Sequence, residues 1–276
     1  MSSPLFPILQ DGQDELGSQE AFGGLESPQP RPLLAFDGEA GSAECVPLLK
    51  ACQAALVRCA ESGVGAVLPV VGLSPAGLKF LESTLGEGEV VVNVAGGHQY
   101  EAKETVLPGL WRVWTREASG ELRSMHLEVG PVPHVAVAAN RGGTLADVSI
   151  GQPPEGVMNV VPVLAELRHR SQTWQSGQPN HVMSFTLLPM TEADMAFLEA
   201  QLGHGPVRGE SKGFSRCRVE LTTVRNIWSV QHFNAMGKLI LDTLEVGDVP
   251  SALVAGGHDF EDSATRLGEW LEVAVS

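Results

Sequence analysis

The sequence predicts an α+β fold built from two tandem homologous repeats, each with helices covering an antiparallel sheet, related by a pseudo-two-fold axis and preceded by a disordered acidic tail. The main observation is an internal repeat at a constant offset of 117 residues: Ser74–Ala139 and Thr191–Gly256 share 23 of 66 positions without a gap. The second is a shared pattern of helical periodicity followed by alternation. We expect a tail over 1–44, repeat units over 45–139 and 158–276, a linker over 140–157, and a C-terminal helix closing the second unit.

Charge separates the tail from the rest of the chain. The 276 residues carry a formal net charge of −15, and residues 1–44 contain Arg31 and the acidic residues Asp11, Asp14, Glu15, Glu20, Glu26, Asp37, Glu39 and Glu44. Nucleic acid and anionic membranes repel such a charge, so we expect neither as the main partner. A solvated tail and an acidic lure for a basic partner both remain open.

Neither a targeting signal nor a membrane span is evident. The first basic residue is Arg31, and the longest apolar run, Val64–Leu73, is shorter than the ~18 residues that a membrane helix needs. Four cysteines are too few for a disulfide framework. We therefore expect a cytoplasmic protein without membrane insertion.

Each repeat begins with an amphipathic helix, a short strand and a second helix. Pro47 is expected in the first turn of the first helix, and Asn159 as the cap of its counterpart. The strands are Val64–Val71 and Met183–Leu188. Ser74-Pro75 and Thr191-x-x-Asp194 begin the second helices, which end at Gly86 and Gly203. Their apolar stripes are Leu78, Leu81, Leu85 and Met195, Leu198, Leu202.

Alternating segments then predict four antiparallel strands at about 88–95, 99–107, 109–116 and 122–130, with counterparts 117 residues later. Trp111 and Val113 share one face of their strand, and Arg112 takes the other. The closing helix over 262–275 presents an inner face consisting of Ala264, Leu267, Trp270, Leu271 and Ala274.

The motifs for catalysis and metal binding are weak. Cys45, Cys52 and Cys59 are seven residues apart, so on one helix they lie about 10.5 Å from one another and cannot share a metal ion. We interpret them as buried small hydrophobic residues. CxxC, HExxH, GxSxG and phosphate-loop patterns are missing from the sequence. No catalytic residue, metal ligand or cofactor is predicted.

Seven residues are candidates for partner binding. Trp111 and Trp228 are core residues or aromatic anchors in a groove between the repeats. Arg112, His126 and Glu128 are expected on an exposed sheet face that differs from its copy. The duplicated carboxylates Glu82/Glu199 and Glu128/Glu245 are solvated or interface residues, or an acid–base pair across the pseudo-two-fold axis. The candidates are Glu87, Glu89, Trp111, Arg112, Glu128, Trp228 and Glu245.

Six landmarks in order resemble the HupH/HyaF family of [NiFe]-hydrogenase expression and maturation proteins, called HoxQ in some operons. They are Leu85-Gly86-Glu87-Gly88-Glu89-Val90, Gly109-Leu110-Trp111-Arg112-Val113, Gly156-Val157-Met158-Asn159, Leu188-Pro189-Met190-Thr191-Glu192-Ala193-Asp194, Asn226-Ile227-Trp228 and Asp262-Ser263-Ala264-x-Arg266-Leu267. The likeness covers about residues 45–275. It implies a non-enzymatic chaperone that holds the hydrogenase small-subunit precursor, with its iron–sulfur clusters and twin-arginine export signal, and that meets other hydrogenase accessory proteins.

Two other hypotheses stay open. One is a metal or iron–sulfur cluster carrier in the same pathway that uses Cys217 with a nearby histidine such as His232. The other is a hydrolase or transferase with Glu128 and Glu245 in a deep pocket at the repeat interface.

Overall fold

The computed structural model describes residues 40–186, 188–213 and 215–275. The predicted tail lies almost entirely outside them. The elements of the first half are α1 (Ser42–Ser62), β1 (Ala66–Pro69), α2 (Pro75–Leu85), β2 (Val90–Val94), β3 (Gln99–Glu104), β4 (Leu110–Arg116), β5 (Leu122–Val129) and α3 (His134–Gly142). Those of the second half are α4 (Val160–Thr173), β6 (His181–Ser184), α5 (Glu192–Leu202), β7 (Val207–Ser211), β8 (Arg216–Leu221), β9 (Ile227–Phe233), β10 (Leu239–Val246), the 3₁₀ turn η1 (Ser251–Leu253) and α6 (Gly257–Val275).

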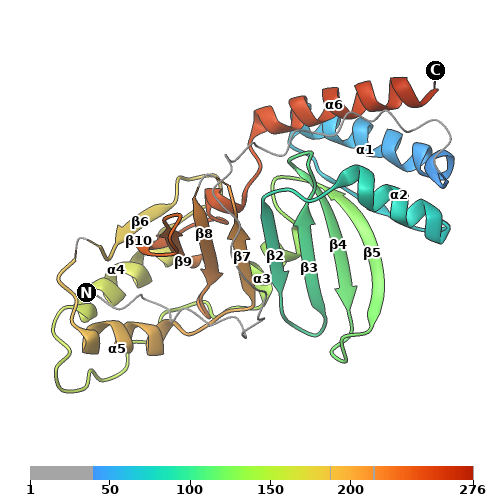
Figure 1. The fold of residues 1–276 in the computed structure, drawn as a ribbon. Helices are drawn as coiled ribbons and strands as arrows, with labels where there is room; N and C mark the ends of the chain where they lie inside the picture. Colours follow the sequence, from blue (N-terminus) through green and yellow to red (C-terminus); the bar gives the residue numbers. More distant parts are fainter. Residues whose placement is uncertain (1–39, 187, 214, 276) are drawn as a thin grey trace.

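All ten described strands form one sheet in the order β1-β5-β4-β3-β2-β7-β8-β9-β10-β6 (Figure 1). Every neighbouring pair is antiparallel. The two repeats meet where β2 pairs with β7, so the sheet runs from one repeat into the other.

The structure confirms the tandem repeats. Strands β2 to β5 and helix α2 have bounds that, shifted by 117 residues, are those of β7 to β10 and α5. The counterpart of α3 is the single turn η1. At the centre of the sheet Val92 pairs with Gly209, its own counterpart, which places the pseudo-two-fold axis at this pair.

Three clusters of buried side chains hold the layers together. One joins α1, α2 and α6 to the sheet of the first repeat, and a second joins α4 and α5 to the sheet of the second repeat. The third spans the junction: Val92 and Val219 from the two sheet halves pack with Ala136 of α3 and Leu253 of η1. This third cluster makes the β2–β7 boundary part of the core.

Helix α6 crosses from the second repeat to the first. It follows η1 in the chain but packs beside α1 (Figure 1). Ala264, Leu267 and Leu271 are buried in the core cluster of the first repeat, and Trp270 is partly buried against it. The predicted inner face is therefore correct over these residues; the side chain of Ala274 lies outside the described part.

Several local predictions were wrong. Pro47 lies beyond the first turn because α1 begins at Ser42. Leu78 is 41% exposed, and Phe80 is buried in its place. The third helix, α3, ends inside the predicted linker. Strand β6 begins at His181, earlier than expected.

Candidate functional site

Trp111 on β4 and Trp228 on β9 occupy equivalent, fully buried positions in the junction core. Each indole N–H donates to a glycine carbonyl, Trp111 to Gly130 at 2.9 Å and Trp228 to Gly247 at 3.2 Å. With their polar groups satisfied inside the protein, both rings are core residues. Because both side chains are 0% exposed, neither is accessible to a partner in this structure.

Arg112 is also buried, contrary to the expectation of an exposed face. It is 2% exposed and lies on the opposite side of the sheet from His126 and Glu128, because β4 and β5 pair Arg112 with Leu127. Its guanidinium donates to the carbonyl of Gly86 at 2.8 Å and to Glu82 at 3.4 Å. The buried Arg112 thus completes the end of α2.

The surroundings of Arg112 form a mixed cluster, which we call the Arg112 cluster: Glu82, Glu87, Lys103, Arg112 and Trp114. Lys103 pairs with Glu87 at 3.2 Å, and Arg112 lies 5.2 Å from the centre of the Trp114 ring. Glu82 and Glu87 are exposed, so these two carboxylates are the parts of the cluster that a partner can reach. The alternation from Arg112 to Trp114 along β4 was a sequence signal for the partly buried Trp114.

Glu128 and Glu245 do not meet. They lie on β5 and β10, with six strands between them, so at the usual spacing of about 4.8 Å they stand ~34 Å apart across the sheet. The buried Glu128 accepts the backbone N–H of His134 at 2.7 Å, and the half-buried Glu245 accepts from the side chain of Asn180 at 3.1 Å. This separation excludes the acid–base pair that the sequence left open as an alternative.

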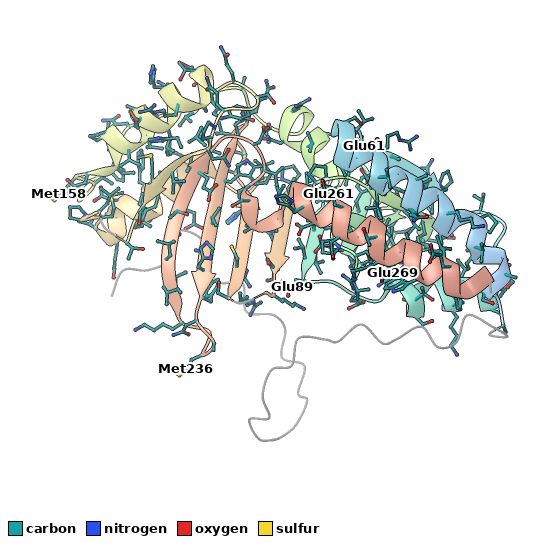
Figure 2. The ribbon with its side chains drawn as sticks, turned by 90° about the horizontal axis from the view of Figure 1, so that it is seen from above. Glu61, Glu89, Met158, Met236, Glu261 and Glu269 are labelled. Carbon is teal, nitrogen blue, oxygen red and sulfur yellow. The ribbon has the colours of Figure 1, made fainter. Side chains whose placement is uncertain are left out.

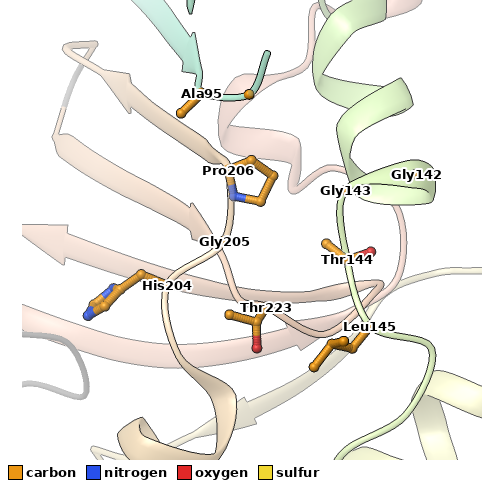
Figure 3. Close-up of a pocket in the computed structure, with 10 residues that line it drawn as sticks. Ala95, Gly142, Gly143, Thr144, Leu145, His204, Gly205, Pro206 and Thr223 are labelled. Carbon is orange, nitrogen blue, oxygen red and sulfur yellow. The ribbon is translucent and has the colours of Figure 1, made fainter. Parts of the chain in front are cut away.

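A shallow hollow of about 770 Å³ opens at the boundary of the repeats (Figure 3). We call it the junction hollow; its lining is Ala95, Gly96, Gly142, Gly143, Thr144, Leu145, His204, Gly205, Pro206 and Thr223. Leu145 is 59% exposed at its rim. The imidazole of His204 points away from Pro206 and Thr144 (Figure 3) and bonds Glu220 at 2.9 Å. Small and apolar groups therefore dominate the surface.

The equivalent place across the pseudo-two-fold axis carries two carboxylates where the hollow has His204 and Pro206. The counterparts of His204 and Pro206 are Glu87 and Glu89, and that of Ala95 is Lys212. Glu89 sits at the boundary itself, since its carbonyl accepts the N–H of Lys212 from the second repeat. We call Glu87 and Glu89, which flank Gly88 on the segment between α2 and β2, the acidic junction. The sequence predicted Glu87 and Glu89 as candidate residues but did not predict the hollow. The pair Gly142-Gly143, which lines the hollow, was the sequence feature that could have indicated it.

Cys217 and His232 lie close together on β8 and β9, with Sγ and Nε2 3.8 Å apart. Burial, with a smaller contribution from Glu245, raises the pKa of the Cys217 thiol to about 12, which disfavours the thiolate that binds metals. Among the described residues, no group of three or more His, Cys, Asp or Glu side chains is placed to hold a metal ion.

Asp194 links two of the sequence landmarks, Gly156–Asn159 and Leu188–Asp194, through hydrogen bonds. One carboxylate oxygen accepts the N–H groups of Met158 and Asn159, both at 2.8 Å, and the other accepts that of Thr191 at 3.0 Å. Burial raises the pKa of Asp194, but these hydrogen bonds outweigh it and lower the pKa to about 2. Asp194 thus caps both α4 and α5, whereas the predicted cap Asn159 instead donates its side-chain N–H to Pro189.

The model of the family described as "HupH hydrogenase expression protein, C-terminal conserved region" matches residues 46–144 and 157–274, one match on each repeat. The chain belongs to the HupH hydrogenase expression protein family. This match confirms the resemblance seen in the sequence. No described helix is long and apolar enough to cross a membrane.

Several curated relatives of this HupH family member carry names from hydrogenase expression and hydrogenase operons. Hydrogenase expression/formation protein HupH of Rhizobium leguminosarum bv. viciae is 44% identical over 68% of this chain and 67% of that protein. HoxQ of Cupriavidus necator is 37% identical over 70% and 68%. The hydrogenase-1 operon protein HyaF of Escherichia coli is 30% identical over 88% and 87%. A solved HupH from Thiobacillus denitrificans is 31% identical, with TM-score 0.33, over 36% of this chain and 90% of that one.

Proposed function

We propose that this protein is a non-enzymatic accessory chaperone of [NiFe]-hydrogenase maturation that binds the iron–sulfur small-subunit precursor before assembly and twin-arginine export. The observation that carries the proposal is the family match across both repeats, together with relatives named for hydrogenase expression and formation. Other hydrogenase accessory proteins are the second class of partner.

The shape of the junction supports a binding role. A chaperone needs an accessible surface, and the junction hollow is broad and open. The acidic junction lies at the equivalent place across the axis. An export signal joins basic and apolar segments, and such a segment is complementary to an acidic surface and an apolar one. Glu87 and Glu89 are therefore the partner-contacting residues that we retain from the seven candidates.

Co-purification tests the function. The full chain, expressed with the small-subunit precursor or with the mature subunit that lacks the export signal, should retain the precursor. Retention of the mature subunit alone would contradict the proposal. Anaerobic elemental analysis of the same samples tests the cluster-carrier alternative, since stoichiometric iron in the protein without its partner would favour a carrier.

Paired variants test the surface. Glu87→Gln with Glu89→Gln should weaken precursor binding, most clearly at low salt, because two negative charges are lost from the junction. The matched control removes two charges from the exposed Glu61 on α1 and Glu269 on α6, both visible in Figure 2. Equal loss in both pairs would mean that only net charge matters.

A further inference from the structure

The first two turns of α6 are docked on the Leu107–Gly109 turn of the first repeat. Ser263 donates from its hydroxyl to the carbonyl of Pro108 at 2.9 Å, and the ring of Phe260, 4% exposed, covers Gly109. A Cβ at Gly109 would lie 2.4 Å from Phe260 Cε1, and this residue has φ +82. Since only glycine suits both the close approach and this backbone, the turn is shaped to receive α6.

Glu104, the last residue of β3, is hydrogen-bonded to that turn. It is 6% exposed and accepts the N–H of Gly109 at 3.2 Å. The single residue Glu104 therefore links the end of β3 to the surface that holds α6.

The charged groups that act on Glu104 are carboxylates: Asp259 from α6 and Glu89 from the segment before β2. On the same sheet face its neighbour on β4 is Trp111, and beyond it the Glu128 carboxylate of β5 lies 3.7 Å from His126. The cations of β3 and β4 are on the other face, where Lys103 and Arg112 bond Glu87 and Glu82. An ionised Glu104 thus adds a third negative charge beside Asp259 and Glu89.

We propose that Glu104 is a pH-sensitive latch for α6: while its carboxyl is protonated the first two turns of α6 stay docked on the Leu107–Gly109 turn, and loss of the proton loosens α6 from the first repeat. Burial, then the charges of Asp259 and Glu89, raise the pKa of Glu104 to about 7 against the opposing effect of the Gly109 N–H. The transition therefore falls near neutral pH. Helix α6 is the element that responds, because Asp259 lies in its first turn and Phe260 lies against Gly109, whose N–H donates to Glu104.

Hydrogen exchange on the full chain at pH 6 and pH 8, corrected for intrinsic rates, tests the latch. Peptides from the first half of α6 should lose protection by up to about tenfold between these pH values, the limit that linkage sets for a carboxyl with pKa near 7 when docked and near 4.5 when free. Peptides from α5 serve as the reference and should not change. Protection of α6 that does not vary with pH would overturn the proposal.

Two variants locate the effect. Glu104→Gln should keep α6 protected at pH 8, and Glu121→Gln, an exposed carboxyl on the β4–β5 turn, should behave like the natural protein. Asp259→Asn removes one facing charge and should shrink this change in protection, which keeps the test decisive if Glu104→Gln folds poorly. An undiminished change in either Glu104→Gln or Asp259→Asn would assign the pH response elsewhere.

Discussion

Val92 on β2 pairs with Gly209 on β7, and Gly209 is the residue that the repeat places at the position of Val92. The two repeats solve the same packing problem in opposite ways. In the first repeat, the larger residue is on the strand: Val92 packs in the same cluster as the small Ala136 of α3. In the second repeat, the strand carries Gly209, and the larger Leu253 of η1 packs against it. A Cβ at Gly209 would lie 2.3 Å from Leu253 Cδ1, so the two volumes are matched.

Gly209→Ala should therefore destabilise the protein by about 1–3 kcal/mol through overpacking against the buried Leu253. In a Leu253→Ala background the same change should cost much less, because the added methyl group enters the new cavity. Chemical denaturation of the four proteins of this double-mutant cycle measures the difference. Gly97→Ala, where an added Cβ meets nothing within 4 Å, is the control. Additive costs would show that Gly209 and Leu253 do not share volume.

Asp194→Ala should destabilise the protein by about 2–5 kcal/mol, since it leaves the ends of two helices without their shared cap. The control Asp262→Ala removes a carboxylate whose pair with Arg266 is exposed, and should cost at most about 1 kcal/mol. The pKa of Asp194 is lowered to about 2, so its stabilising effect is complete above about pH 4 and disappears as the pH falls through 2. Denaturation at pH 7 compares the variants; equal costs would refute the double cap.

The strands and their 117-residue register were predictable because alternation and duplication are local signals. The continuous sheet was not, since the β2–β7 pairing joins segments whose pattern is equally compatible with two separate sheets. The burial of Arg112 escaped prediction because its cover, the end of α2, comes from packing between elements. Leu78 fits the helical period of Leu81 and Leu85 better than Phe80 does, yet tertiary packing buries Phe80 and leaves Leu78 exposed. The crossing of α6 had no sequence signal beyond its apolar face.

Arg112→Ala should destabilise the protein by about 2–4 kcal/mol, because it leaves the Gly86 carbonyl without its donor and removes packing from Trp114. Arg112→Lys should recover part of this through its charge without the planar fork. Arg123→Ala, at a side chain 55% exposed, should cost less than about 1 kcal/mol. Thermal unfolding ranks the three variants. An Arg112→Ala protein as stable as Arg123→Ala would contradict the stabilising role of a buried Arg112.

Glu104→Gln should change how stability depends on pH. Because the folded pKa of Glu104 is raised to about 7, the fold holds this proton more tightly than the unfolded chain, and the free energy of unfolding falls as the pH rises from about 4.5 to 7. The full difference is about 3 kcal/mol. Denaturant titrations from pH 5 to 8.5 should show this slope in the natural protein and a shallower one in Glu104→Gln. Parallel curves would exclude a shifted Glu104.

Native mass spectrometry of the purified full chain mixed with purified small-subunit precursor tests the central claim most directly. The proposed function predicts a stoichiometric complex with the precursor, weakened by Glu87→Gln with Glu89→Gln and preserved in Glu61→Gln with Glu269→Gln. Absence of that complex, in samples where the precursor is folded and carries its export signal, would contradict the account.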